Sequence, residues 1–425
     1  MNEDAKITRR DFFRQAAKAA LGMAAVGGIS ASRALGANDN MNQGQERKMT
    51  KRIAVKEHLV FSGRGEYKLA CGAMIAQAPN GDLLCSWLSG GDKEPATDNC
   101  ILMSRSGDGG RTWGEAKLLL PAGEMASGLS SMHSTHDGRL IAFGAGWPSE
   151  KQYTEWHYFR MESKDSAHTW GPHEPIVLHG NHGSIGSPIR LMNGELLFAG
   201  SFFDERPQPL LAPVSRLCEA GTEEEALAMP AGPGKPSAGK FGTHLHGCSV
   251  YISPDENGRT LTEFGHIANR PLGLLEPSCV QLRDGRIAMF MRAEWGGFLW
   301  RSESRDNGRT WTPAVETEIP NPTTAAHALR LADGRIALLH NATGGRKGER
   351  GVRNPLSIWV SDDELQSWSI REDVIASSGN YRPANWPDGQ DQLAYPCGIV
   401  LGRRLVFVYD RNRRDVLFVE VEISA

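Results

Sequence analysis

One short pattern recurs along the chain and constrains its fold: Ser, any residue, Asp, any residue, Gly, two residues, Trp. Clean copies occupy 106–113 and 304–311, and degraded copies occupy 163–170, 253–260 and 361–368. Asp and Ser oxygens accept hydrogen bonds from nearby backbone N–H groups, Gly adopts a positive φ, and Trp can bury its ring beneath a turn. The pattern predicts a β-turn between two strands. Its repetition gives the Asp a structural role, because a catalytic residue is not needed five times.

A second repeat alternates with the first. Six tight turns, most of them Asn-Gly or Asp-Gly, are flanked by apolar runs and lie at 80–81, 137–138, 193–194, 284–285, 333–334 and 401–402. Such dipeptides between alternating hydrophobic residues predict β-hairpins. Hairpins and Asp turns follow one another, which gives six four-stranded units. This radial repetition predicts an all-β fold, a six-bladed β-propeller.

The two ends of the chain indicate how the ring closes. After Gly402 only the apolar runs 405–409 and 416–423 remain, so the last unit lacks a fourth strand. The apolar stretch 52–61 precedes the first hairpin and has no partner in its own unit. We expect this N-terminal strand to complete the last blade, which leaves no long edge exposed. The propeller domain is therefore predicted to span 52–425.

The first residues have a different character. The run Thr8-Arg9-Arg10-Asp11-Phe12-Phe13-Arg14 precedes the apolar stretch 16–29 and the small residues of 34–37. This order predicts a twin-arginine signal peptide over 1–37, followed by a polar linker over 38–51. An amphipathic helix with two chance arginines is the alternative. We expect the twin-arginine export machinery as a partner, a periplasmic or secreted location, and no membrane association after signal removal.

Composition excludes several classes of function. The net charge of -3 gives no nucleic-acid footprint. The chain has seven Cys, an odd number, and none of them has the close spacing of a zinc or redox site. Six of them lie inside predicted strands, where Cys behaves as a small buried hydrophobe: Cys71, Cys85, Cys100, Cys248, Cys279 and Cys397. We expect no metal and no cofactor, and local hydrogen bonds rather than metal ligation for His133, His182 and His327.

The predicted layout limits where a ligand can bind. Hairpin turns and Asp turns share one rim, so the opposite rim carries the loops between second and third strands and the connections between blades. Residues at that rim converge on the central channel. The candidates are Lys68, Asp92, Glu94, His133, Trp147, His182, Asp204, Glu276, Arg292, His327, Asn341, Arg353, Tyr395, Asp410 and Arg411.

At several of these positions the chain resembles the sialidase (neuraminidase) superfamily, whose six-bladed propellers carry the Asp turn as an "Asp box". The segment 276–286 resembles the one that bears the family's catalytic glutamate, and Ala394-Tyr395-Pro396 resembles the site of its tyrosine nucleophile. Met291-Arg292 and Arg353-Asn354-Pro355-Leu356 resemble two segments that bear substrate-carboxylate arginines. The resemblance covers nearly the whole mature chain and implies these roles for Glu276, Tyr395, Arg292 and Arg353.

The residue types suit the chemistry of such a sugar. A sialic acid carries a carboxylate on its anomeric carbon, which repels a carboxylate nucleophile but not a neutral tyrosine. A glutamate beside the tyrosine can take the phenolic proton, and arginine forks grip a carboxylate through two oxygens. Arg411 and His327 are further candidates for substrate binding.

The chain departs from the family's pattern in the first unit. Where sialidases offer an arginine, the chain has Lys68, which keeps the charge but loses the bidentate geometry. The loop that bears the family's acid reads 90–98 here and holds three carboxylates. Asp92 or Glu94 is the expected acid, while Asp98 is expected at the entry to the next strand.

Three functions remain open at this stage. The first is an exported retaining glycosidase, exo-alpha-sialidase-like, that releases a terminal acidic sugar. The second is a propeller that binds a glycan without turnover. The third is another carbohydrate-active enzyme on the same scaffold, such as a uronate lyase that uses Tyr395 and a histidine. The long segment 206–242, rich in Pro, Gly and Glu, is expected to be a lid or a flexible loop.

Overall fold

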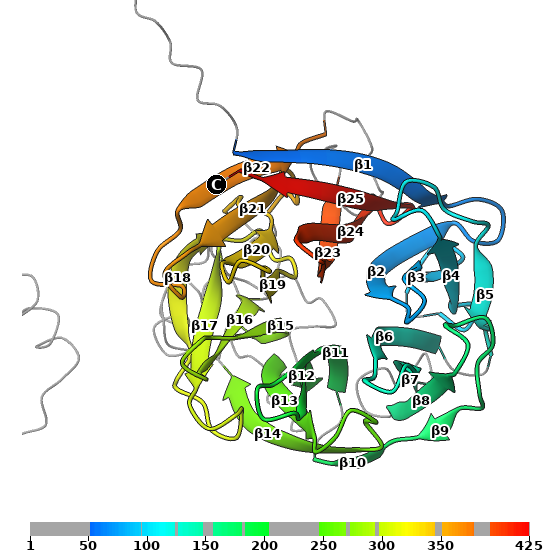
Figure 1. Cartoon of the computed structure of the whole chain (residues 1–425), viewed down its shortest axis with the longest axis horizontal. Helices are drawn as coiled ribbons and strands as arrows, with labels where there is room; N and C mark the ends of the chain where they lie inside the picture. The colour runs from blue at the N-terminus through cyan, green and yellow to red at the C-terminus, as the bar shows by residue number, and fades with distance from the viewer. Residues whose placement is uncertain are drawn as a thin grey trace, which may run out of the picture. The chain divides into compact units, whose positions relative to one another are not determined.

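The computed structural model describes residues 52–94, 96–123, 126–147, 156–180, 183–203, 246–268, 273–293, 297–344, 351–377 and 392–424. These residues form β-strands and loops, with no α-helix among them. Six sheets surround a central axis, which confirms the all-β, six-bladed propeller (Figure 1). The predicted signal peptide, the predicted linker, the 206–242 segment, His182 and Asp204 lie outside the described residues. Within the described ranges, no helix is long and apolar enough to cross a membrane.

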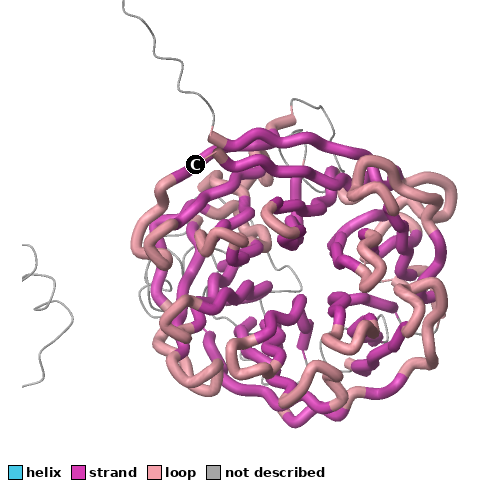
Figure 2. Tube along the Cα trace, viewed as in Figure 1, coloured by secondary structure: helices cyan, strands magenta, loops and turns pink. Residues whose placement is uncertain are grey.

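Each blade is built on four antiparallel strands, which run outward from the central axis in chain order except that β1 is the outermost strand of the last blade (Figures 1 and 2). The blades comprise β2 (Leu69–Gln77), β3 (Leu83–Gly90), β4 (Cys100–Ser106) and β5 (Lys117–Leu120); β6 (Ala126–Ser134), β7 (Leu140–Trp147), β8 (His157–Ser163) and β9 (Glu174–Pro175); β11 (Gly183–Arg190), β12 (Leu196–Phe203), β13 (His246–Ser253) and β14 (Thr260–Ala268); β15 (Leu274–Gln281), β16 (Ile287–Ala293), β17 (Phe298–Ser304) and β18 (Val315–Pro320); β19 (His327–Arg330), β20 (Ile336–His340), β21 (Leu356–Ser361) and β22 (Ile370–Ile375); and β23 (Leu393–Leu401), β24 (Arg404–Arg411), β25 (Asp415–Ile423) and β1 (Ile53–Ser62).

The N-terminal strand closes the ring, as predicted. β1 pairs antiparallel with β25, from Ile53 opposite Ile423 to Ser62 opposite Asp415. The last blade thereby gains the outer strand that its own sequence lacks. The closure joins the two ends of the domain by main-chain hydrogen bonds, so β25 is paired on both sides and β1 forms the outer edge of blade 6.

One strand was not predicted. β10 (Val177–His179) pairs parallel with β14, with Val177 opposite Thr260, and adds a fifth strand to blade 3. It follows β9 directly, so the chain runs from the outer edge of blade 2 along the outer edge of blade 3. Three residues are too few to show the alternation of a strand, so the pattern of residues could not indicate β10.

The core lies between neighbouring blades. The rings of Phe143 in blade 2 and Phe198 in blade 3 meet edge to face, with centroids 4.9 Å apart. Because both faces of a blade are covered by its neighbours, the second strands of the blades are buried almost continuously; Ile287–Ala293 of β16 is buried at every position. The six described cysteines are buried free thiols, as expected from their places in strands.

Hydrogen bonds within the Asp turns give the repeated Asp its structural role. Asp306 Oδ1 accepts bonds from the Ser304 hydroxyl at 2.8 Å and the Thr310 N–H at 2.8 Å, and Oδ2 accepts the Thr310 hydroxyl at 2.6 Å. The Ser304 oxygen in turn accepts the N–H of Gly308 at 2.8 Å. The same bonds recur in 106–113, 163–170 and 361–368. In the copy at 253–260, Asp255 Oδ1 accepts the N–H of Asn257 instead.

Removing one such carboxylate should therefore cost stability. We expect Asp306→Ala to lower the free energy of unfolding by about 1–2 kcal/mol, because three donors lose their acceptor at once. Asp255→Ala is the matched control and should cost less than half as much. Urea denaturation of the two variants measures both values, and equal losses would show that the Asp306 network contributes nothing beyond a single bond.

Candidate active site

The innermost strands carry bulges that aim side chains at the channel. The pairing register shifts between Leu275 and Ser278 in β15 and between Ala394 and Cys397 in β23. At these bulges Glu276 and Tyr395 adopt φ values of 49° and 54°, in the left-handed region. Each precedes a proline, a position that normally favours extended backbone. Such backbone costs of order 1–3 kcal/mol per residue and is concentrated at functional sites.

The bulges bring three of the expected residues together. The Tyr395 hydroxyl donates a hydrogen bond to Glu276 Oε1 at 3.3 Å, and Arg292 Nη1 lies 2.5 Å from Glu276 Oε2. The Arg292 side chain is 7% exposed and the Glu276 side chain 27% exposed. Glu276 therefore sits between a phenol and a buried guanidinium, with one oxygen facing each.

Arg353 covers the tyrosine ring. Its guanidinium carbon lies 5.4 Å from the centroid of the Tyr395 ring, and its Nη2 donates to the Thr323 carbonyl at 3.0 Å. Burial raises the pKa of Tyr395, the Glu276 carboxylate raises it further, and Arg353 and Arg292 oppose both effects. The phenol is thus protonated at neutral pH and needs a base before its oxygen can act as a nucleophile. Glu276 is the carboxylate within hydrogen-bonding distance of it.

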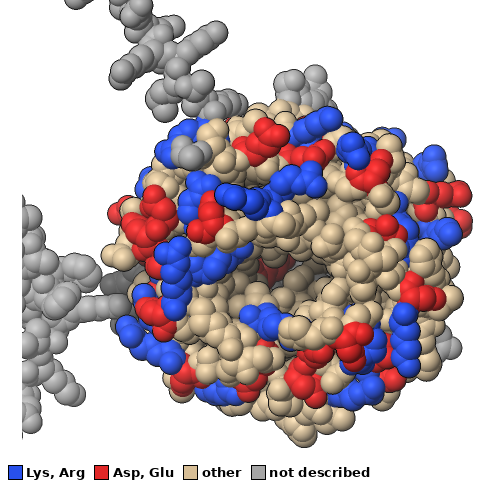
Figure 3. All heavy atoms as spheres, viewed as in Figure 1, with Lys and Arg blue, Asp and Glu red and all other residues tan. Residues whose placement is uncertain are grey.

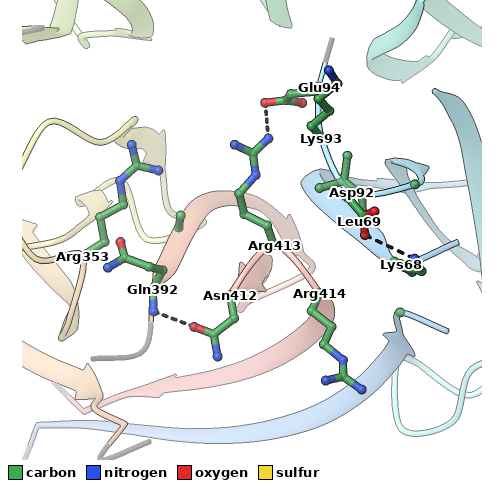
Figure 4. A pocket seen from close by; sticks show the side chains of 13 residues that line it. Lys68, Leu69, Asp92, Lys93, Glu94, Arg353, Gln392, Asn412, Arg413 and Arg414 are labelled. Carbon is green, nitrogen blue, oxygen red and sulfur yellow. Dashed lines mark hydrogen bonds and ion pairs between the residues drawn. The ribbon is translucent and has the colours of Figure 1, made fainter. Parts of the chain in front are cut away.

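A cavity of about 560 Å³ opens beside Arg353 (Figure 4). Its walls come from the start of blade 1, the loop after β3, the start of β23 and the turn between β24 and β25. The lining residues are Gly63, Lys68, Leu69, Gly91, Asp92, Lys93, Glu94, Arg353, Gln392, Ala394, Asn412, Arg413 and Arg414. Lys68, Asp92, Glu94 and Arg353 thus reach one cavity, on the rim that the layout indicated. Tyr395, Glu276 and Arg292 are not among its lining residues, and Arg353 connects the cavity to the Tyr395 ring.

The carboxylates of the 90–98 loop have different environments. Asp92 is 81% exposed and lies 3.4 Å from Lys68 Nζ. Glu94 forms an ion pair with Arg413 and accepts a hydrogen bond from the Cys71 thiol at 3.2 Å. Asp98 accepts the N–H of Gly91 at 3.1 Å and stands just before β4, as expected. Of the three carboxylates, Asp92 and Glu94 line the cavity.

Arg413 is a site residue that the sequence reasoning missed. It lies in the turn between β24 and β25, pairs with Glu94 and places Nη2 3.4 Å from Cys71 Sγ. The expected candidate Arg411 instead lies 3.5 Å from Asp415 and is not among the lining residues of the cavity. A signal was present, because this connection belongs to the functional rim and holds three arginines within four residues.

A buried carboxyl group supports the same corner of the site. Asp410 is fully buried, and its Oδ2 accepts the N–H of Gly72 at 3.2 Å. Gly72 stands at the bulge of β2 with a φ of 62°. Blade 3 holds blade 4 in a similar way, since the Ser201 hydroxyl accepts the N–H of Glu276 at 2.6 Å. Burial raises the pKa of Asp410 to about 7, and Arg413 partly offsets that effect.

The histidine candidates make local contacts. His327 Nε2 lies 3.1 Å from the Gly398 carbonyl and joins β19 to β23, outside the cavity lining. His133 Nε2 lies 3.0 Å from Arg190. Burial lowers the pKa of each imidazole to about 4, so both are neutral near pH 7. Among the described residues no group of three or more His, Cys, Asp or Glu could hold a metal ion.

Two further channel candidates can be placed in part. The Asn341 amide donates to the carbonyls of Pro355 and Leu393, at 2.8 and 3.0 Å, and so links blades 5 and 6. Trp147 ends β7, and its side chain lies outside what is described.

Solved structures share this fold. A Hadza microbial sialidase, Hz136, matches with a TM-score of 0.61 and 15% identity, over 83% of this chain and 65% of its own. A protein of unknown function from Dyadobacter fermentans gives a TM-score of 0.61 and 16% identity, over 87% of this chain and 99% of its own. The NanB sialidase of Streptococcus pneumoniae gives a TM-score of 0.59 and 12% identity, over 85% of this chain and 70% of its own. The resemblance to a sialidase-like scaffold is thereby confirmed at the level of fold.

Sequence comparison points the same way. A sialidase from Micromonospora viridifaciens is 24% identical over 372 residues, which cover 81% of this chain and 52% of the relative. The chain thus spans about half the length of that relative. The model of the BNR repeat-like domain matches residues 81–407, which take in strands of all six blades. The chain therefore belongs to the BNR repeat-like family, on a propeller scaffold shared with sialidases.

Proposed function

We propose that the protein is an exported glycoside hydrolase of the sialidase class, which releases a terminal acidic sugar with retention of configuration. The observation that carries this proposal is the hydrogen bond between Tyr395 and Glu276, with Arg292 and Arg353 beside it. A protonated phenol, a carboxylate base and two buried guanidinium groups meet the requirements of a sugar whose anomeric carbon bears a carboxylate.

Tyr395 and Glu276 would act in both steps of the reaction. Glu276 takes the phenolic proton as the Tyr395 oxygen bonds to the anomeric carbon, and the glycosidic bond breaks. Water then attacks that carbon and gives a proton to the carboxylate that had protonated the leaving oxygen, the bond to Tyr395 breaks, and the phenolate regains its proton from Glu276. Two inversions give net retention.

Asp92 is the better candidate for the acid that protonates the leaving oxygen. Both oxygens of Glu94 are already engaged, one by Arg413 and the other by the Cys71 thiol. Asp92 is exposed on the loop at the cavity wall and is paired with Lys68 at 3.4 Å. A weakly paired carboxyl group at an open edge can take a proton from solvent and pass it to the leaving group.

Arg413 would supply the third cation of the carboxylate clamp. Arg292 and Arg353 come from blades 4 and 5, and the expected position in blade 1 holds Lys68, whose ammonium lacks a planar fork. Arg413 reaches the cavity from blade 6 and is held by Glu94 and Cys71. Its guanidinium can bind a carboxylate through two nitrogens, which Lys68 cannot do.

One observation favours glycan binding without turnover. Arg292 Nη1 lies 2.5 Å from Glu276 Oε2, so a guanidinium already engages the carboxylate that would act as the base. The uronate lyase loses support, because the described candidate histidines His133 and His327 contact Arg190 and the Gly398 carbonyl. Binding without turnover is therefore the second candidate.

Hydrolysis of an aryl α-sialoside separates the two candidates. We expect wild type to release the aryl group, Tyr395→Phe to lower kcat by at least about 10³-fold, and Glu276→Gln to lower it by about 10²–10⁴-fold. Tyr67→Phe removes the same hydroxyl group in the segment between β1 and β2 and serves as the control. Binding of the sialoside by wild type with no release of the aryl group would favour the binding protein instead.

Arg413→Lys tests the proposed clamp. The variant keeps the charge but loses the fork, so KM for the sialoside should rise about tenfold while kcat changes less. Arg403→Lys, in the hairpin turn between β23 and β24, is the control for a change of the same type away from the cavity. A fall in kcat with KM unchanged would contradict a role in ground-state binding.

The buried Asp410 should make stability depend on pH. Its folded pKa of about 7 exceeds the unfolded value of about 3.9, so its contribution is full below about pH 4 and is lost as pH rises through 7. Asp410→Asn keeps the acceptor for Gly72 and removes the charge. Between about pH 5 and about pH 8 the variant should gain roughly 2–3 kcal/mol relative to wild type. Urea unfolding at both pH values measures the change, and an unchanged difference would refute it.

A further inference from the structure

The cavity has a local excess of positive charge. Five cationic side chains line it, namely Lys68, Lys93, Arg353, Arg413 and Arg414, against the two carboxylates Asp92 and Glu94. The whole chain carries a net charge of -3. On the face drawn in Figure 3, both signs are interspersed around the central hollow. The excess is therefore a property of the cavity, and it exceeds what one substrate carboxylate needs for neutralisation.

Three of these five cations already contact other side chains. Lys68 pairs with Asp92, Arg413 pairs with Glu94, and Arg353 covers Tyr395. Lys93 and Arg414 remain. Within the described part of the chain, no carboxylate pairs with the Arg414 guanidinium, although Asp92 and Glu94 line the same cavity.

The backbone fixes the position of Arg414. Its N–H donates to the Arg411 carbonyl at 3.1 Å, and its carbonyl accepts the N–H of Gly63 at 2.8 Å. Figure 4 shows its side chain directed away from the pair that Arg413 forms with Glu94. Arg414 thus presents a charge in the same cavity but apart from the group that would hold the first carboxylate.

A second hollow adjoins this arginine. It has a volume of about 660 Å³ and is lined by residues 59–64, 113–116 and Arg414. Gly63 and Arg414 belong to both linings, so the two hollows meet at these residues. A ligand bound in the first cavity that extends toward the second hollow would pass Arg414.

We propose that the substrate is a glycan with a second anionic group, carried by the sugar next to the one released, and that Arg414 binds that group. This assignment rests on the proposed function, because it takes Tyr395 as the reacting end. The second group is a carboxylate or a sulfate, since a guanidinium fork binds either through paired N–H donors. One charge-assisted contact of this kind gives about tenfold in affinity.

The test compares three oligosaccharides by calorimetry, with full-length Tyr395→Phe protein so that no turnover occurs. Sialyllactose carries one anionic group, disialyllactose carries a second carboxylate, and sialyllactose sulfated on its galactose carries a sulfate. We expect at least one doubly charged probe to bind about tenfold more tightly than sialyllactose. Adding Arg414→Ala should reduce this preference to less than about threefold, while adding Arg403→Ala, the matched control, should preserve it.

Each result bears on the inference. Equal affinity for all three probes, no binding of any probe, or an intact preference in the Arg414→Ala protein overturns it, as does an equal loss of preference in Arg403→Ala. Which doubly charged probe is preferred identifies the second group. Turnover of the aryl sialoside by wild type is measured separately. Turnover of the aryl sialoside without a preference for a doubly charged probe would support the proposed function and refute the second anion site. The preference without turnover would support the second anion site and refute the proposed hydrolysis.

Discussion

The site depends on bulges that neighbouring blades hold in place. Ser201 of blade 3 accepts the N–H of Glu276, and Asp410 of blade 6 accepts the N–H of Gly72. A left-handed residue before proline is unfavourable in isolation, so the ring must supply the stabilisation. Packing on both faces of every blade provides it, because a blade cannot relax its inner strand without opening two interfaces. The closing strand β1 matters to the site for the same reason, since it ties blade 6 into the ring.

Electrostatics within the ring then sets the chemistry. Burial alone would hold Tyr395 as an inert phenol, and Arg353 and Arg292 counter that effect while Glu276 adds to it. Arg292 at the same time forms an ion pair with Glu276, the base in the proposed reaction. A substrate carboxylate that entered between these arginines would compete with Glu276 for Arg292. In the proposed reaction, substrate binding and release of the base would thereby be coupled through one guanidinium group.

The sequence could reveal features that repeat or have a fixed residue type. Alternating turns specified six blades, a missing outer strand and a functional rim, and the rim placed Glu276, Arg292, Arg353 and Tyr395 near one channel. Other features depend on tertiary geometry alone. Arg411 and Arg413 differ by two residues in a turn, and only the bends at Asn412 and Arg413, with φ of 60° and 54°, determine which one faces the cavity. The three-residue β10 and the acceptors Ser201 and Asp410 likewise have no signature in a single strand.

The position of Arg413 in the last blade affects how the cavity wall is built. In the proposed carboxylate clamp, the bidentate donor is Arg413, in the turn between β24 and β25 of blade 6, and Lys68 stands just before β2 of blade 1. Glu94, on the loop of blade 1, pairs with that turn, so blades 1 and 6 are joined across the cavity by an ion pair as well as by the contact between Asp410 and Gly72. The cavity wall is thus built at the seam where the ring closes. Arg414 shares that wall through its bond to Gly63, just beyond the end of β1. Ring closure and the charge that faces the ligand therefore depend on the same few residues.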